Sequence, residues 1–173
     1  MLEWKVGDVR IRVLVELRQQ GGELELLPDA TPANLAAIPW LRPHFVSPDG
    51  KLVFNVQMFV LETPSRRIAV DTCIGNDKTI GLAAWSNLQG RFLEDLAAMG
   101  LPPESFDTVL CTHLHVDHVG WNTRKVGGRW IPTFPRARYL LVEEELRHWR
   151  GAEDAFGEVF RESIDPVLDA GLG

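Results

Sequence analysis

The chain has 173 residues, of which 45% are hydrophobic and 24% charged, a balance typical of one globular domain with its own core. The formal net charge of −6 argues against a general nucleic-acid binder, because neutralising phosphates requires a basic surface. No apolar stretch approaches the roughly 20 residues that cross a bilayer, and the N-terminus lacks the apolar core of a signal peptide, so we expect a cytoplasmic protein without a membrane partner.

The first 50 residues predict N-terminal strands followed by an irregular, lid-like segment. Residues 9–17 alternate apolar with charged side chains, which indicates a half-buried strand. Gly21-Gly22 predicts a turn, with a returning strand over residues 23–27. Residues 28–50 contain five prolines and are expected to hold little regular structure.

The middle of the chain predicts a hairpin, a loop and a helix. Residues 52–63 are rich in Val, Phe and Leu and indicate a long strand, which turns at residues 64–67 and returns over residues 68–71. A loop is expected over residues 72–86. Apolar residues then fall at helical spacing from Leu88 to Met99, and Gly100 with Pro102 ends that helix.

The last third predicts two strands, a small hairpin and two helices. The elements are listed here in chain order: a strand at 107–112, a hairpin around Gly127-Gly128, a strand at 137–142, a helix opening at 143–145, and a helix at 156–170 with a break near Pro166. Gly171-Leu172-Gly173 indicates a helix stop. The order of elements predicts an α/β chain with helices packed on a sheet, and one domain over residues 1–173.

The two cysteines, Cys73 and Cys111, are too few for a disulfide framework, and we expect both to be small buried side chains. Cys111 lies two residues before a histidine, so on an extended segment it would point to the same side as that histidine. A position next to a metal therefore stays open for Cys111.

The most informative stretch is the histidine cluster directly after the strand at 107–112. It supplies four candidate metal ligands within six residues: His113, His115, Asp117 and His118. Imidazole nitrogen and carboxylate oxygen are both good zinc ligands. His113 and His115 are two residues apart, so an extended backbone aims both rings to one side, and the cluster follows the carboxyl end of a strand, where α/β sheets usually place their sites.

The pattern HxHxDH at residues 113–118 resembles the first metal motif of the metallo-β-lactamase superfamily. The strand that ends in Asp71, the strand before it and the helix before the cluster fit the same order, so that the resemblance covers about residues 50–173. Residues 112–121 look closest to lactonase-like and organophosphate-hydrolase-like members. The resemblance implies an αββα sandwich of which this chain supplies about the first half, a mixed sheet with helices on one face, with the metal site in residues 51–173.

The resemblance also implies roles for the site residues. His113 and His115 would hold one ion, Asp117 and His118 a second, and Asp71 would orient the metal loop by hydrogen bonding, unless it only caps a turn at the strand end. The ions would activate water to cleave an ester, a lactone or a related bond, and Asp117 could also carry a proton to the leaving group. Zinc is the default metal, and manganese, iron or cobalt would suit the same ligands.

The superfamily's remaining ligands, two histidines and a bridging aspartate, are expected in the second half of its fold. The histidines outside the cluster, His44 and His148, look like ordinary, partly exposed residues. The chain therefore resembles an N-terminal half, which would expose one face of its sheet unless it forms a homo-oligomer or a second half covers it. An alternative is a truncated, metal-binding remnant without catalysis that self-associates or needs a complementing chain.

Aromatic and apolar side chains near the cluster are candidates for a substrate pocket: Trp121, Trp85, Met58 and Phe59. They predict a small-molecule substrate with an apolar part, such as an acyl lactone or an aryl ester. A nuclease of the same superfamily is disfavoured by the acidic charge and the lack of a basic arm.

Overall fold

The computed structural model describes residues 2–21, 27–151 and 157–173. By its internal contacts the chain divides into two compact units, Met1–Glu16 together with Gln57–Gly173, and Leu17–Val56. The metal-site residues all belong to the first unit. The single domain expected from the sequence stays a prediction.

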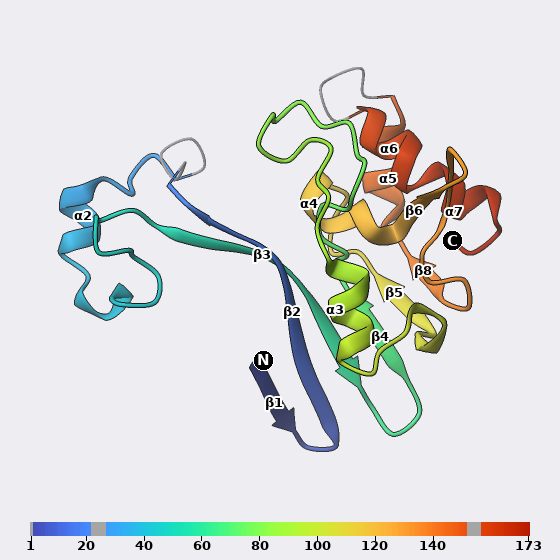
Figure 1. The fold of residues 1–173 in the computed structure, drawn as a ribbon, viewed down its shortest axis with the longest axis horizontal. Helices are drawn as coiled ribbons and strands as arrows, with labels where there is room; N and C mark the ends of the chain where they lie inside the picture. Colours follow the sequence, from blue (N-terminus) through green and yellow to red (C-terminus); the bar gives the residue numbers. More distant parts are fainter. Residues whose placement is uncertain (1, 22–26, 152–156) are drawn as a thin grey trace. The chain divides into compact units, whose positions relative to one another are not determined.

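The main sheet has six strands in the order β1-β2-β3-β4-β5-β8. Their bounds are β1 Leu2–Val6, β2 Val9–Gln20, β3 Val53–Glu62, β4 Arg67–Val70, β5 Thr108–Leu110 and β8 Arg138–Leu140. The pairs β1–β2 and β3–β4 are antiparallel hairpins, whereas β4–β5 and β5–β8 are parallel, so the sheet is mixed as predicted. Figure 1 shows the parallel strands side by side.

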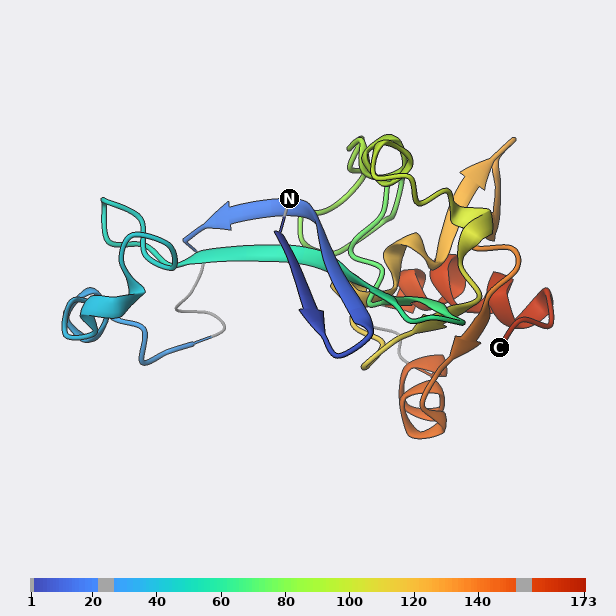
Figure 2. The same cartoon turned by 90° about the horizontal axis from the view of Figure 1, so that it is seen from below.

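The remaining elements are helices, short 3-10 turns and a separate hairpin. The helices are α2 Pro32–Ala36, α3 Phe92–Ala98, α4 Val116–Val119, α5 Glu143–Arg150, α6 Gly157–Ser163 and α7 Asp165–Asp169. The 3-10 turns are η1 Pro39–Leu41, η2 Pro103–Ser105 and η3 Gly120–Asn122, and β6 Thr123–Val126 pairs with β7 Arg129–Pro132. Figure 2 shows α3 lying over one face of the main sheet. Among the described residues, no helix is both long and apolar enough to cross a membrane.

Most predicted elements are confirmed, with differences at their ends. Strand β1 was not predicted, and α3 begins at Phe92 instead of Leu88. The short helix α4 inside the histidine cluster was also missed, because one turn leaves no periodic signal. The break before α7 falls at Ile164, two residues before Pro166. Residues 23–26 of the strand expected over 23–27, and the first residue of the helix expected from 156, lie outside the described residues.

The face of the sheet that holds Val60, Ala69 and Val109 is fully buried, each side chain being 0% exposed. The opposite face is also apolar. One row of register partners on it runs across four strands, from Phe59 to Val70, Leu110 and Leu140. These side chains are only partly buried, and Leu140 is 51% exposed. We call this row the open face. A strand that is apolar on both sides is typical of a sheet covered on both sides.

Candidate metal centre

Two neighbouring parallel strands deliver the site residues to one edge of the sheet. Asp71 follows β4, and Thr112 and His113 follow β5. Because parallel strands end at the same edge, Asp71 and the histidine cluster meet there. His115 is the residue immediately before α4, and this single helical turn carries Asp117 and His118.

The structure brings the three clustered histidines together. The Nε2 atom of His113 lies 3.0 Å from the Nδ1 atom of His115. The ring centroids of His113 and His118 are 4.0 Å apart, and those of His113 and His115 are 4.6 Å apart. Asp117 Oδ2 lies 3.4 Å from His118 Nε2. Three imidazoles and one carboxylate therefore share a small space, half-buried apart from the exposed His115.

Asp71 is bound directly to Thr112, which begins the segment that carries the four candidate ligands. We call this segment, residues 112–118, the metal loop. Its Oδ1 accepts the backbone N–H of Thr112 at 2.8 Å, and its Oδ2 accepts the Thr112 hydroxyl at 2.9 Å. Oδ2 also lies 3.0 Å from His118 Nδ1. The Asp71 backbone has a φ of 55°, a left-handed conformation that is uncommon outside glycine and is found at functional sites. This placement is the one expected for a residue that orients the loop.

The same contacts define the tautomer of His113. The ionised Asp71 can only accept hydrogen bonds, so the Thr112 hydroxyl donates to it. Thr112 Oγ1 is then free to accept, and it lies 3.1 Å from His113 Nδ1. His113 must therefore carry its proton on Nδ1, which leaves the lone pair on Nε2 available for a metal, as in many histidine metal ligands.

The charges at the site are strongly coupled. Burial raises the pKa of both Asp71 and Asp117, but their other contacts together offset it and lower both values. The largest of these contacts is His118 in each case, and Thr112 also contributes at Asp71. Burial lowers the pKa of His118, whereas these two carboxylates raise it to about 9 overall. Burial and the neighbouring His118 and His115 lower the pKa of His113. The site thus gathers two carboxylates beside the clustered imidazoles, a negative environment that suits a cation.

Two of the donors, His113 and His115, are spaced to share one divalent ion. The 3.0 Å between His113 Nε2 and His115 Nδ1 is close to the roughly 3.3 Å expected for two nitrogens on one tetrahedral zinc. His118 Nδ1 is buried and is not aligned for a hydrogen bond to any described group. Among the described residues, no three His, Cys, Asp or Glu side chains are gathered as a complete ligand set.

The metal loop is held against the loop that follows Asp71. Thr72 N–H donates to His118 O at 2.7 Å, and Gly120 N–H donates to Cys73 O at 2.7 Å. A Cβ on Gly120 would lie 1.6 Å from the backbone oxygen of Ile74. Only glycine fits at position 120, because the two backbones touch there.

A buried carboxylate from β2 completes this support. Glu16 accepts the backbone N–H groups of Ile74 at 2.7 Å and Gly75 at 3.1 Å, and the indole N–H of Trp121 at 2.5 Å. Burial raises the pKa of Glu16 despite these three donors. The carboxylate therefore links β2, the loop after β4 and η3.

The candidate pocket residues occupy different environments. Met58 is 0% and Trp121 4% exposed, and the Trp121 ring stacks on Phe92 with centroids 5.0 Å apart, so in this structure both side chains pack in the interior. Trp85 is half-buried in the loop after β4, and Phe59 lies on the open face.

The cysteines and the outlying histidines behave as ordinary residues. Cys73 and Cys111 are free and buried, as predicted. Cys111 Sγ contacts Asn122 Oδ1 at 3.7 Å, and burial raises the pKa of this thiol to about 12, so a neutral thiol and not a thiolate lies there. His44 and His148 are exposed, and the His148 ring packs against Trp149.

Sequence reasoning missed four residues that support the site: Thr112, Glu16, Glu145 and Trp149. Thr112 could have been found from its place directly before the cluster. Glu145 and Trp149 lie on α5, about thirty residues further along the chain, and Glu16 lies about a hundred residues before the cluster. No motif links such distant positions, because tertiary packing alone brings them together.

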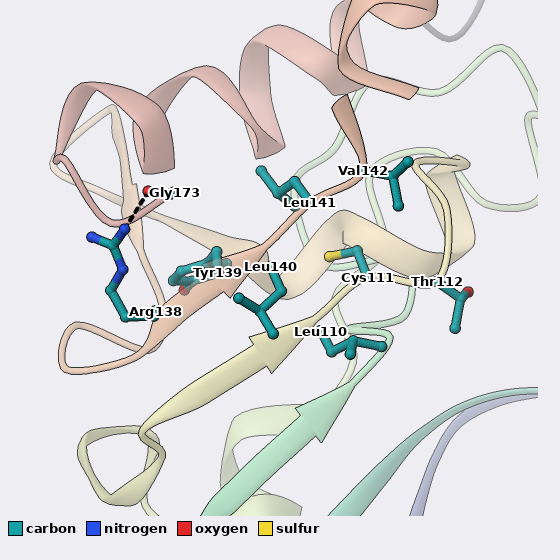
Figure 3. A pocket seen from close by; sticks show the side chains of 9 residues that line it. All are labelled: Leu110, Cys111, Thr112, Arg138, Tyr139, Leu140, Leu141, Val142 and Gly173. Atoms are coloured by element: carbon teal, nitrogen blue, oxygen red, sulfur yellow. Dashed lines mark hydrogen bonds between the residues drawn. The ribbon is translucent and has the colours of Figure 1, made fainter. Parts of the chain in front are cut away.

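A shallow groove of about 470 Å³ lies beside the site, along β5, β8 and the C-terminal residues. Figure 3 shows Leu110 and Leu140 in its wall, with the guanidinium of Arg138 bound to the backbone of Gly173. The groove reaches Thr112 but is lined by none of the clustered histidines. It continues the apolar character of the open face.

Comparison with known proteins gives the following likenesses. The sequence model of the Metallo-beta-lactamase superfamily matches residues 52–172. No curated protein matches the chain. Among solved structures, a probable metal-dependent hydrolase from Staphylococcus aureus is similar with a TM-score of 0.69 and 18% identity over 95% of this chain. The hydrolase AbOPH of the beta lactamase superfamily gives a TM-score of 0.69 and 21% identity over 98% of it.

A third similar structure is AidC, a dizinc quorum-quenching lactonase in complex with its product, an N-acyl-L-homoserine, with a TM-score of 0.66 and 19% identity over 98% of this chain. At these identities the likeness shows the fold. This chain spans 58%, 58% and 56% of the three solved chains, so it corresponds to little more than half of their length.

Proposed function

The chain belongs to the metallo-beta-lactamase superfamily, and from that premise we propose that it forms the metal-binding half of a hydrolase that cleaves an ester, a lactone or a related bond. The observation that carries the proposal is the convergence of His113, His115, Asp117 and His118 at the sheet edge, with Asp71 bound to the loop that presents them. Hydrolysis is the chemistry that this donor set suits best, because neutral imidazoles and carboxylates are the ligands of catalytic zinc.

The proposed ligand assignment follows the contacts. His113 through Nε2 and His115 through Nδ1 would hold one ion, and Asp117 with His118 would hold a second. When bound, such ions polarise an electrophilic centre and acidify water. The chain's own residues prepare the site: Asp71 fixes Thr112, and Thr112 fixes the tautomer of His113. Asp117 would receive or return a proton. Zinc is the proposed metal, with manganese, iron or cobalt as alternatives.

The proposed substrate is a small molecule with an apolar part, such as an acyl lactone or an aryl ester. The lactonase among the similar structures supports this class, and so does the apolar surface beside the metal loop. We further propose that full activity needs ligands from outside this chain, because two donors per ion leave each metal under-coordinated. A second copy or a complementing segment would supply them at the open face.

A metal-binding remnant without catalysis is the second candidate. It would bind metal through the same proposed ligands as the hydrolase. The two candidates share the metal site and differ only in turnover.

Metal titration combined with activity assays tests the proposal. The chain is titrated with Zn²⁺, and hydrolysis of lactones, aryl esters and phosphotriesters is then measured, with His113→Ala as the disabled variant and the exposed His44→Ala as its control. We expect binding of fewer than two full equivalents, lost in His113→Ala and retained in His44→Ala. Binding without turnover would favour the remnant, and absence of specific Zn²⁺ binding would overturn both readings.

A further inference from the structure

Helix α5 touches the metal loop from outside the histidine motif. The Oε2 atom of Glu145 accepts the backbone N–H of Leu114 at 3.0 Å. Leu114 lies between His113 and His115, and its own side chain is buried with 5% exposure. The peptide that joins the two proposed ligands is therefore held from both sides, by the core and by α5.

The same carboxylate oxygen also holds an aromatic ring. Glu145 Oε2 accepts the indole N–H of Trp149 at 3.1 Å. The two residues are four apart on α5, so they share one face of the helix. On the surface of the same helix, the exposed Arg147 pairs with Glu143 and with Glu144.

The Trp149 ring then meets a proposed metal ligand. The rings of Trp149 and His115 have centroids 5.2 Å apart and an interplanar angle of 72°, an edge-to-face contact. His115 also contacts His113. The exposed His115 ring thus has two ring neighbours, His113 and Trp149.

We propose that α5 is a positioning element of the metal centre, in which Glu145 fixes the Leu114 peptide and the Trp149 indole, and Trp149 fixes the His115 ring. Groups that contact metal ligands and hold them in position raise the affinity for the metal, because those ligands are already ordered before the ion binds. The inference rests on the proposed metal site, but the contacts that it invokes exist in the metal-free chain.

Two variants of α5 and one matched control test this role. Glu145→Ala removes the shared acceptor, Trp149→Leu removes the aromatic contact, and Glu144→Ala removes an equal charge from an exposed position of the same helix. Zn²⁺ affinity is measured by competition with a chromophoric chelator, and the Co²⁺ absorption spectrum is recorded at saturation. Circular dichroism checks that each variant is folded, and Trp149→Phe, which keeps a ring but loses the N–H, replaces any variant that is not.

We expect Glu145→Ala and Trp149→Leu to weaken Zn²⁺ binding by about 10-fold or more and to change the Co²⁺ spectrum, while Glu144→Ala does neither. In the metal-free chain, the His115 ring resonances in NMR spectra should shift in both α5 variants and stay unchanged in the control. Unchanged affinity, spectrum and His115 resonances in folded α5 variants would overturn the inference. A wild-type chain that binds no Zn²⁺ would instead overturn the proposed function, and the His115 resonances would still decide the role of α5.

Discussion

Thr112 is the residue that couples Asp71 to the first proposed ligand. Its hydroxyl donates to Asp71 and lies 3.1 Å from His113 Nδ1, so that it sets which nitrogen of His113 carries the proton. A side chain that cannot accept a hydrogen bond would free the His113 ring to rotate and to change tautomer. Asp71 therefore reaches His113 through this exposed hydroxyl and lies next to His118 directly.

Thr112→Val should weaken Zn²⁺ binding by about 10-fold, because it keeps the size of the side chain and removes the hydroxyl. Thr112→Ser keeps the hydroxyl and serves as the control, with affinity close to that of the wild type. Chelator competition measures the affinity, and NMR detection of the imidazole nitrogens reports the tautomer. Equal affinities for the Val and Ser variants would show that the hydroxyl has no part in orienting His113.

At the scale of elements, the metal loop depends on how closely two backbones approach. The loop after β4 and the segment from α4 to η3 exchange hydrogen bonds between Thr72 and His118 and between Cys73 and Gly120. The two backbones are so close that no side chain fits at Gly120. Glu16, on β2, binds the loop after β4 through the backbone N–H of Ile74. The site is therefore supported by contacts among three segments that are distant in sequence.

Gly120→Ala should lower the free energy of unfolding by about 2 kcal/mol, because overpacking of this kind costs about 1–3 kcal/mol. The atom that the new Cβ would meet is the backbone oxygen of Ile74, which cannot rotate away. Gly151→Ala is a matched control, since a Cβ there meets nothing within 4 Å. Urea denaturation compares the variants, and equal losses in both would contradict a steric origin.

The loop after β4 also carries a buried lysine that ties it to α6 and β6. Lys78 Nζ lies 2.6 Å from Thr123 Oγ1, 3.2 Å from Glu162 O and 3.6 Å from the Trp130 ring centroid. Burial lowers its pKa to about 7, against a usual value of 10.5, although Glu162 and Asp77 raise it. Between pH 7 and pH 10.5, Lys78 is protonated in the unfolded chain and neutral in the native one. The free energy of unfolding therefore increases as pH rises through this range.

Between pH 7 and pH 9, the stability of the wild type relative to Lys78→Met should rise with a slope of up to about 1.4 kcal/mol per pH unit. Denaturation at several pH values gives this difference, and the exposed Lys51→Met serves as the control for removal of a charge. A flat difference for Lys78→Met would mean that the Trp130 ring and the Glu162 carbonyl keep the native lysine protonated.

At the scale of the whole molecule, the open face is an apolar surface that the chain leaves only partly buried. One apolar row runs across four strands: Phe59, Val70, Leu110 and Leu140. Val60, Ala69 and Val109, on the other face of the sheet, are fully buried, whereas this row is not. Burying apolar area contributes about 25 cal/mol per Å², so contact with another apolar surface would stabilise this face. This is the physical basis for the proposed second copy or complementing segment.

Leu140→Lys should reduce self-association of the chain and its binding of a hydrophobic dye, because it places a charge in the row. Val126→Lys is the control, since Val126 is exposed to the same degree, 51%, but belongs to the β6–β7 hairpin. Sedimentation velocity measures the association. A wild-type chain that is strictly monomeric and binds no dye would argue against a need for cover at the open face.

Local patterns in the sequence determined most of the elements and the metal cluster. The β3–β4 hairpin, α5 and the β6–β7 hairpin follow from alternation, turns and helix ends, which act over a few residues. The four candidate ligands could be identified because all of them come from one short segment: His113, His115, Asp117 and His118. The superfamily, too, could be identified from this segment and the strand that ends in Asp71.

Tertiary structure alone decided which residues support that segment. Glu16, Glu145 and Trp149 reach the metal loop from β2 and α5, and Trp121 turns inward to Glu16 instead of facing a pocket. Such contacts depend on strand order and helix packing over thirty to a hundred residues, and a side chain's neighbours across that distance leave no periodic trace in the sequence. The candidate ligands therefore lie in one short segment that the sequence reveals, whereas their positioning is a property of the packed fold.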